Sequence, residues 1–302
     1  MIQTTNSAFP ASNNTLPISG HTQLTGLLGS PVAHSISPLM HNEAFRILGL
    51  DYAYLCFDVG TEHLKTAVEG LKALNARGFN LTMPDKTEMC GLCDTLSPAA
   101  RMIGAVNTVV NDNGILTGHN TDGIGYTQAI REAGYEITGK AMTLFGAGGA
   151  ATAIAVQAAL EGATSIRLFC RQGRSWERAA QLVSLINRET ACEASLHDTA
   201  DTSALKKSLD DSYILTNATS CGMAPDTEGC ILTDASCLHP GLIVSDIIYN
   251  PRETRLMKLA KEAGCPTCNG LYMLLYQGAE AFRLWTGTQM PISQIKEKYF
   301  KG

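Results

Sequence analysis

The stretch AMTLFGAGGAA, from Ala141 to Ala151, decides the fold of this chain. Its first five residues form an apolar run that predicts a buried strand, and the Ala-rich run that continues to Leu160 predicts a helix. Between them stands a match to the pattern G-x-G-x-x-G/A, namely Gly146-Ala147-Gly148-Gly149-Ala150-Ala151. In that setting the first glycine makes a tight turn, the second lets backbone approach a pyrophosphate, and the helix N-terminus offers free N–H groups. The sequence therefore predicts a dinucleotide site here, with an ordinary glycine-rich turn as the alternative.

The loop after the next expected strand, residues 165–169, bears on which dinucleotide is bound. An NAD site usually carries Asp or Glu at this point, where the acid holds the ribose 2′-hydroxyl. This chain instead has two arginines and no acid, in Cys170-Arg171-Gln172-Gly173-Arg174-Ser175. Arginine suits the multi-donor recognition of a phosphate, although solvated arginines are also common on such loops. We therefore expect NAD(P) binding with a preference for NADP over NAD.

On both sides of the glycine loop, short apolar runs alternate with helical patterns, which is typical of βαβ units and a largely parallel sheet. Strands are expected at residues 25–29, 52–59, 79–82, 213–215 and 242–245. Residues 106–110 and 115–117 flank an Asn-Asp-Asn-Gly turn and predict a hairpin. Ser37 is expected to cap a helix with Pro38 at its first position, and Thr61 is expected to cap another. A long amphipathic helix is expected at 271–285.

Composition narrows the class of protein. The 302 residues are 45% hydrophobic and only 17% charged, with a net charge of −5 and a pI near 5.8. A protein that binds nucleic acid usually carries an excess of basic residues, which this chain lacks, so nucleic acid is not an expected partner. No apolar run is long enough to span a membrane, and residues 1–21, which contain no Lys or Arg, lack the features of a targeting peptide. We expect a disordered tail at 1–21 and a cytoplasmic protein.

The ten cysteines include two pairs with C-x-x-C spacing, Cys90/Cys93 and Cys265/Cys268. The pairs lie far apart in the sequence, and neither has a histidine at ligand spacing, so a zinc site is not expected. Nor does a thioredoxin-like pattern surround either pair. We expect no metal, and reduced thiols that serve as small hydrophobic side chains.

Several polar motifs have no evident packing purpose. They are His34-Ser35-Ile36-Ser37-Pro38, Asn80-Leu-Thr82-Met-Pro-Asp-Lys86, Gly104-Ala-Val-Asn107-Thr108, Gly118-His-Asn120-Thr121-Asp122-Gly123, Asn217-Ala-Thr-Ser-Cys-Gly222-Met223, Tyr249-Asn-Pro251 and Asn269-Gly270-Leu-Tyr-Met-Leu-Leu-Tyr-Gln277-Gly278. Taken in order with the glycine loop, they resemble the shikimate dehydrogenase family over residues 24–285. Details of the chain look most like the quinate/shikimate dehydrogenase branch.

The resemblance implies a reversible hydride transfer between NAD(P) and C3 of shikimate, giving 3-dehydroshikimate, or of quinate, giving 3-dehydroquinate. Lys86 matches the family's catalytic lysine, and Asp122 matches its partner aspartate. An alcohol that loses a hydride must also lose its O–H proton, and a positioned lysine can relay that proton. The alternatives to these catalytic roles are that Lys86 is a surface lysine after a proline turn and that Asp122 caps a helix. The pathway direction, biosynthetic or catabolic, is left open.

The same resemblance implies the binding residues. Those expected to contact the substrate are Ser35 and Ser37 at its carboxylate, Asn107, Thr121 and Gln277 at its hydroxyls, and Thr82, Tyr54 and Tyr249, of which the two tyrosines could equally be core aromatics. Those expected to contact the cofactor are Gly146, Ala147, Gly148, Gly149, Ala150, Cys170, Arg171, Gln172, Gly173, Arg174, Ser220, Ile247, Tyr249, Asn250 and Gly270. Two of them depart from the family pattern: Cys170 replaces an Asn, and Gly173 stands where the branch that accepts NAD has an acid.

The expected fold class is α/β with two domains. The resemblance implies a Rossmann-type doubly wound domain at 121–270, inserted into an α/β substrate-binding domain with a mainly parallel sheet at 22–120 and 271–302. Two other functions stay open: a dehydrogenase of a related cyclic polyol acid such as aminoshikimate, and a non-catalytic nucleotide or ligand sensor. Retention of Lys86 and Asp122 argues against the sensor. A small molecule is the expected partner, and no motif distinguishes a monomer from a homodimer.

Overall fold

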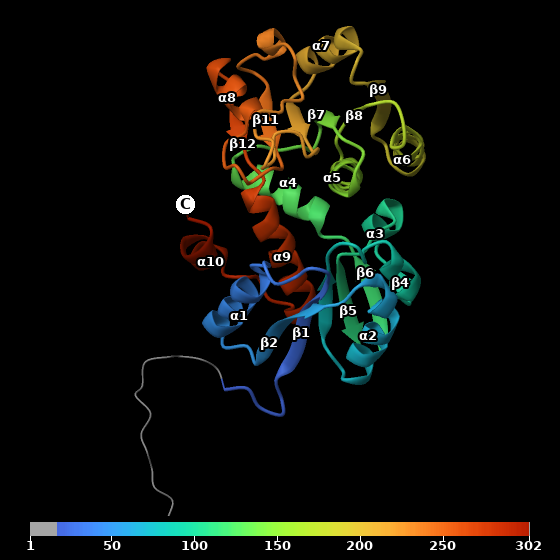
Figure 1. Ribbon diagram of the computed structural model, residues 1–302, viewed down its shortest axis with the longest axis vertical. Coiled ribbons are helices and arrows are strands. Elements are labelled where there is room, and N and C mark those ends of the chain that lie inside the picture. Colours follow the sequence, from blue (N-terminus) through green and yellow to red (C-terminus); the bar gives the residue numbers. More distant parts are fainter. Residues whose placement is uncertain (1–16, 302) are drawn as a thin grey trace, which may run out of the picture.

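The computed structural model describes residues 17–301 and contains two sheets, each covered by helices (Figure 1). Most of the expected N-terminal tail lies outside the described residues. At the described end of that segment, the side chains of Ser19 and Thr22 donate hydrogen bonds to Asp51. This short stretch is therefore attached to the start of the second strand.

The first sheet has the strand order β2-β1-β3-β5-β6-β4. Its strands are β1 (Gln23–Gly29), β2 (Tyr52–Asp58), β3 (Gly78–Leu81), β4 (Thr95–Leu96), β5 (Thr108–Asp112) and β6 (Ile115–His119). Strands β2, β1 and β3 run parallel, whereas β5 pairs antiparallel with both β3 and β6. The hairpin expected around Asn111–Gly114 is therefore confirmed, and α1 (Ser37–Leu48), α2 (Thr61–Ala73) and α3 (Pro98–Ile103) accompany this sheet.

The second sheet is wholly parallel in the order β12-β11-β10-β7-β8-β9. Its strands are β7 (Ala141–Phe145), β8 (Ser165–Cys170), β9 (Glu193–Asp198), β10 (Ile214–Asn217), β11 (Ile243–Asp246) and β12 (Thr267–Cys268). The chain starts at β7, winds outward to β9, and returns to β10 on the other side. This is the doubly wound order of a Rossmann-type domain, whose ligand crevice lies at the carboxyl ends of the two central strands. The expected fold class is confirmed.

The glycine loop lies at that crevice, between β7 and α5 (Gly149–Leu160). Gly146 has a φ of 116°, and a Cβ there would stand 2.7 Å from the carbonyl oxygen of Ala218 at the end of β10. The position therefore requires glycine for both its backbone conformation and its close approach. Beyond the loop, α5 is buried on nearly all sides because its small side chains let it pack deeply. The remaining helices of this half are α6 (Trp176–Glu189), α7 (Thr202–Asp210) and α8 (Arg255–Glu262).

Two helices connect the halves: α4 (Asp122–Glu132) and α9 (Leu271–Thr286). They pack together in the middle of the molecule (Figure 1) and touch at Gly125, where a Cβ would stand 2.7 Å from the backbone of Met273 and of Gln277. The far end of α9 packs on the first sheet, because Trp285 Nε1 donates to the carbonyl of Val109 over 2.9 Å. The C-terminal α10 (Ile292–Tyr299) packs beside α1.

Two expected helix caps are wrong. α1 begins at Ser37 itself, one residue earlier than it would if Ser37 were the cap, and the backbone N–H of Ser37 donates to Ser35 Oγ over 3.2 Å. Gly60 stands at the cap position of α2, and the hydroxyl of Thr61 donates instead to Asp85 over 3.0 Å. The hydroxyl of Thr61 thus has its partner elsewhere in the tertiary structure, whereas the bond between Ser37 and Ser35 is local.

The ten cysteines, all within the described residues, are free. Between residues 17 and 301, no three or more His, Cys, Asp or Glu side chains gather in a way that could hold a metal ion. None of the described helices is long and apolar enough to cross a membrane.

His41 on α1 is fully buried in an aromatic cluster, stacked on Tyr54 with ring centroids 4.5 Å apart. Neither ring nitrogen has a hydrogen-bond partner among the described residues. Burial lowers the pKa of His41 from 6.5 to about 3. A histidine in the unfolded chain therefore binds a proton below pH 6.5, whereas the folded protein resists protonation until about pH 3.

We therefore expect stability to fall as the pH is lowered from 6.5 towards 3. The free energy of unfolding should drop by about 2 kcal/mol between pH 6.5 and 5 on account of His41 alone. Urea unfolding over this range checks the effect. The variant His41→Phe keeps an aromatic ring without a titrating group, so its stability should depend less steeply on pH. Equal slopes for the two proteins would contradict the assignment.

Candidate active site

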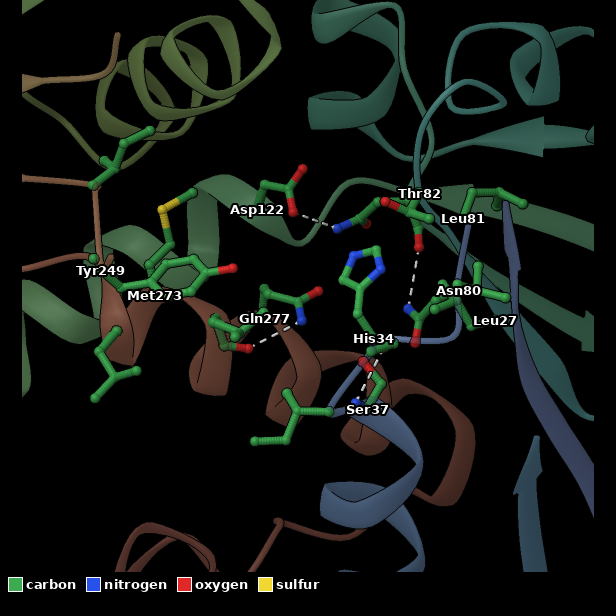
Figure 2. Close-up of a pocket in the computed structure, with 18 of the residues that line it drawn as sticks. Leu27, His34, Ser37, Asn80, Leu81, Thr82, Asp122, Tyr249, Met273 and Gln277 are labelled. Carbon is green, nitrogen blue, oxygen red and sulfur yellow. Dashed lines mark hydrogen bonds between the residues drawn. The ribbon is translucent and has the colours of Figure 1, made fainter. Parts of the chain in front are cut away.

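A cavity of about 490 Å³ lies between the two halves of the molecule. Its walls come from the β1–α1 loop, the end of β3, the start of α4, the segment after β11 and the first turns of α9 (Figure 2). Eight of the ten residues expected to react with or bind the substrate line it: Ser35, Ser37, Thr82, Lys86, Asn107, Asp122, Tyr249 and Gln277. The structure thus brings together motifs from distant parts of the sequence.

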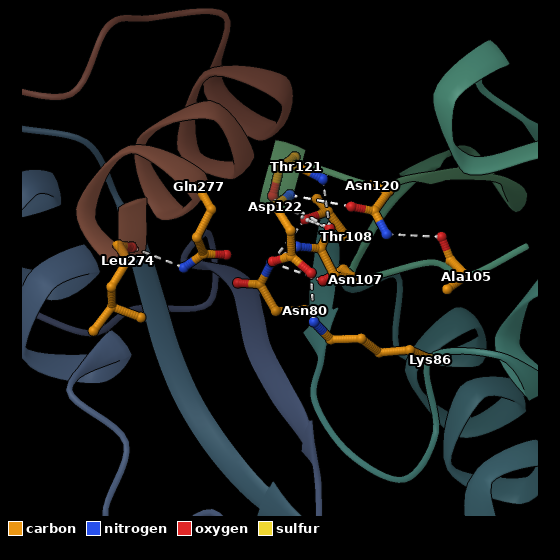
Figure 3. Close-up of polar contacts among 10 residues, drawn as sticks. All are labelled: Asn80, Lys86, Ala105, Asn107, Thr108, Asn120, Thr121, Asp122, Leu274 and Gln277. Carbon is orange, nitrogen blue, oxygen red and sulfur yellow. Dashed lines mark hydrogen bonds and ion pairs between the residues drawn. The ribbon is translucent and has the colours of Figure 1, made fainter. Parts of the chain in front are cut away.

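Lys86 and Asp122 form an ion pair in this cavity (Figure 3). Lys86 Nζ donates to Asp122 Oδ2 over 2.7 Å, and the side chains are 29% and 19% exposed, so both remain open to a ligand. Asp122 is the first residue of α4, but the carboxylate caps no helix N–H group. The alternative of a plain helix cap is therefore wrong. A carboxylate that fixes an ammonium group beside an open cavity is an arrangement that can hold and transfer a proton.

Asn107 orients the aspartate from the other side. Its Nδ2 donates to Asp122 Oδ1 over 2.8 Å, and its Oδ1 accepts from the backbone N–H of Thr121 over 2.8 Å. Because the amide oxygen is bonded to Thr121, the amide nitrogen must face Asp122. Thr121, which was expected to contact the substrate, is itself fully buried and is not among the residues that line the cavity. It supports Asn107 instead.

Tyr54 is the other expected substrate contact that lies behind the cavity wall. The residue is fully buried, and its hydroxyl donates to Asn80 Oδ1 over 2.8 Å. Burial raises the pKa of the Tyr54 phenol. Asn80 does line the cavity, and its Nδ2 donates to Thr108 Oγ1 and to the carbonyl of Asn107. Sequence reasoning missed Asn80 as a site residue, although a buried asparagine within an apolar strand was a signal that could have identified it.

The substrate's expected carboxylate site lies at the start of α1. Ser35, Ser37 and His34 line the cavity here, and the first turn of α1 contains no acidic residue. A helix N-terminus with two hydroxyl groups favours an anion through its free N–H groups and its dipole.

On the opposite wall, Gln277 Nε2 donates to the carbonyl of Leu274 over 3.0 Å, which turns its amide oxygen towards the cavity (Figure 2). Tyr249 stands at the mouth, half exposed.

The expected cofactor residues lie at or after the carboxyl ends of β7, β8, β10, β11 and β12. Ile247, Tyr249 and Gly270 line the cavity itself. A Cβ at Gly270 would stand 1.7 Å from the carbonyl oxygen of Ile247, so the position accepts only glycine. Ser220 and Asn250 are exposed at the same edge, as are Gly148 and Gly149, while Gly146, Ala147 and Ala150 are less open. A dinucleotide along this edge would thus reach the cavity at the Ile247–Gly270 contact.

The cofactor-selecting loop is largely open. Arg171, Gln172, Gly173 and Arg174 are exposed, and neither arginine forms an ion pair within residues 17–301. Cys170 is buried at the end of β8, opposite Asp198 of β9. Burial raises the pKa of the Cys170 thiol, and the charge of Asp198 adds to the rise. Two unpaired guanidinium groups suit a phosphate group, and the structure shows Asp198 as an acid nearby that the sequence pattern did not indicate.

Comparisons with known proteins agree with this site. The sequence profile of the "Shikimate dehydrogenase substrate binding domain" matches residues 27–109, and that of the "Shikimate 5'-dehydrogenase C-terminal domain" matches residues 270–298. The chain is 53% identical over 283 residues to the shikimate dehydrogenase (NADP(+)) of Listeria monocytogenes, which covers 94% of this chain and 97% of the relative. It is 45% identical over 275 residues to the quinate/shikimate dehydrogenase of Escherichia coli, with 91% and 96% covered.

A crystal structure of shikimate 5-dehydrogenase from Listeria monocytogenes, in complex with shikimate and NAD, is similar throughout. It has a TM-score of 0.91 and 53% sequence identity, and the match covers 94% of this chain and 98% of the other. The two profile matches include Ser35, Lys86, Asn107 and Gln277 of the cavity wall, but neither includes Asp122. The chain belongs to the shikimate dehydrogenase family.

Proposed function

We propose that this protein is an NADP-dependent shikimate dehydrogenase that also accepts quinate, that Lys86 carries the proton transfer, and that Asp122 holds Lys86 in place. One observation supports the proposal most strongly: the Lys86–Asp122 ion pair, joined over 2.7 Å, faces a cavity that reaches the carboxyl edge of the doubly wound sheet. The relatives named for shikimate with NADP(+), and for quinate and shikimate together, support the substrate class and the cofactor.

A bound NADP would supply the acceptor for the hydride that leaves C3 of the alcohol, and the chain's own residues handle the proton. The amine form of Lys86 accepts the proton of the C3 hydroxyl, and the ammonium form returns it in the reverse direction. Asp122 holds the Lys86 side chain in place, and Asn107 holds Asp122. Ser35, Ser37, Asn80, Thr82 and Gln277 surround the remaining carboxylate and hydroxyls of the substrate.

A matrix of steady-state rates tests the proposal, with shikimate, quinate and aminoshikimate each measured against NADP and NAD. The highest kcat/KM is expected for shikimate with NADP, with lower but measurable turnover of quinate. Negligible turnover of both shikimate and quinate beside clear turnover of aminoshikimate would favour the related dehydrogenase. Binding of NADP and shikimate without any formation of NADPH would favour a sensor.

The cofactor preference follows from the exposed arginines. The double variant Arg171→Ala/Arg174→Ala is expected to lower kcat/KM for NADP about 30-fold, because it removes charge-assisted hydrogen bonds to the 2′-phosphate. The value for NAD, which lacks that phosphate, should change little. Arg178→Ala, an exposed arginine further along on α6, is the matched control and should leave the preference unchanged. An unaltered ratio of the two cofactors in the double variant would contradict the role of the loop.

The proposal extends to the cellular setting. Ten free cysteines suit the cytoplasm, where thiols stay reduced. Substrate and cofactor are the proposed small-molecule partners. Sedimentation of the purified protein would distinguish a monomer from a homodimer.

A further inference from the structure

Asp85 is a buried carboxyl group next to Lys86 in the sequence, and the proposed reaction gives it no role. The residue is fully buried. Its Oδ1 accepts a hydrogen bond from Thr61 Oγ1 over 3.0 Å, whereas its Oδ2 has no partner among the described residues. Burial raises the pKa of this carboxyl, and Glu88 and Glu62 add to the rise. A buried polar atom left unpaired lowers stability, so an acid is a poor choice here for stability alone.

The turn that carries Asp85 and Lys86 is fixed along its main chain. The N–H of Asp85 donates to the carbonyl of Thr82, and its own carbonyl accepts from the N–H of Met89, each over 3.1 Å. The carbonyl of Lys86 accepts from the N–H of Val106 over 2.8 Å. These bonds join the turn to itself and to the segment before β5. The Asp85–Thr61 hydrogen bond is different, because it joins the turn to the first residue of α2.

We propose that Asp85 is a positioning residue. Its hydrogen bond to Thr61 holds the turn that carries Asp85 and Lys86 against α2, and thereby orients the Lys86 side chain towards Asp122. The inference rests on the function proposed above for Lys86. Asp85 points into the protein and Lys86 stands on the cavity wall, so one turn presents one side chain to each side. A shift of the turn moves Lys86 relative to its partner, and a misplacement of about 1 Å can cost about 100-fold in rate.

Three variants test the inference in steady-state assays with shikimate and NADP. Asp85→Ala is expected to lower kcat about tenfold while each KM stays within about twofold, because the cavity walls are unaltered. Thr61→Val removes the hydroxyl and keeps the side-chain shape, and it should lower kcat to a similar extent. Combining the two changes should lower kcat no further than either alone. Asp85→Asn keeps an acceptor for Thr61 and should restore kcat to within about twofold of wild type.

A matched control separates positioning from loss of stability. Val68→Ala removes two buried methyl groups from the core face of α2 and keeps both partners of the Asp85–Thr61 hydrogen bond, so it should lower Tm yet leave kcat unchanged. If Asp85→Ala and Thr61→Val lower Tm as this control does but keep the wild-type kcat, the positioning role is overturned.

A second readout needs no turnover. The rate at which an N-hydroxysuccinimide ester acylates Lys86, followed by peptide mass spectrometry, should rise about threefold in Asp85→Ala and Thr61→Val as the ion pair loosens. It should stay at the wild-type value in Asp85→Asn and Val68→Ala. An unchanged acylation rate in Asp85→Ala overturns the inference, even if the wild-type protein proves inactive on shikimate. Inactivity of the wild-type protein with a raised rate in Asp85→Ala overturns the proposed function alone.

Discussion

Replacing Lys86 by alanine is expected to lower kcat for shikimate oxidation about 1,000-fold. Alanine cannot take the proton from the C3 hydroxyl, and a positioned acid or base usually contributes between about 100-fold and 10,000-fold to a rate. The amino group of Lys86 bonds to Asp122 within the protein, and the other cavity walls come from separate segments. The KM for shikimate should therefore change much less than kcat. Formation of NADPH at saturating substrate, followed by its absorbance, measures the effect.

The control for this experiment is Lys72→Ala. Lys72 lies on α2 in the same half of the molecule and forms an ion pair with Asp94, remote from the cavity wall. Its removal deletes a lysine charge without touching the proposed proton path, so kcat should stay near the wild-type value. A Lys86→Ala variant that binds NADP normally and still turns over within threefold of wild type would refute the proposed mechanism.

The doubly wound half was largely predictable because its signals are local. The apolar run Ala141–Phe145 forms β7 as expected, and the glycine pattern leads directly into α5 at Gly149. Strand, tight turn and helix start are all encoded within a few adjacent residues there. By contrast, the two-residue strands β4 and β12 show no periodicity, and the order of strands in each sheet depends on long-range pairing.

The residues that make up the site were largely predictable, but the hydrogen bonds among them were not. The ion pair between Lys86 and Asp122 joins two of the residues that the sequence motifs indicated. The motifs could not show that the hydroxyl of Tyr54 bonds to Asn80 or that Thr121 lies behind Asn107. Those relations depend on which side chains meet across different strands and helices. The same reason explains the mistaken cap at Thr61, because a threonine that suits a helix start can find a tertiary partner, here Asp85.

Replacing Asp122 by asparagine is the change with the next largest expected effect, about a 100-fold loss of kcat. The two carboxylate oxygens accept from Lys86 and from Asn107, over 2.7 and 2.8 Å. An asparagine side chain has one acceptor and one donor, so in either orientation its NH₂ group faces another donor. If it faces Lys86, the amine loses its partner and its position. If it faces Asn107, the neighbouring amide must turn away and breaks its bonds to Thr121.

The loss should appear in kcat more than in the KM for NADP, since Asp122 lies at the start of α4 and away from the arginine loop after β8. Asp112→Asn is the matched control, because Asp112 is an exposed carboxylate that pairs with Arg77 at the far end of β5. That variant should keep the wild-type kcat. Because the carboxylate is proposed to hold Lys86 rather than to take the proton itself, Asp122→Asn should retain more activity than Lys86→Ala, and combining both changes should add little to the loss from Lys86→Ala. A combined loss equal to the product of the two separate losses would show instead that Asp122 and Lys86 act independently.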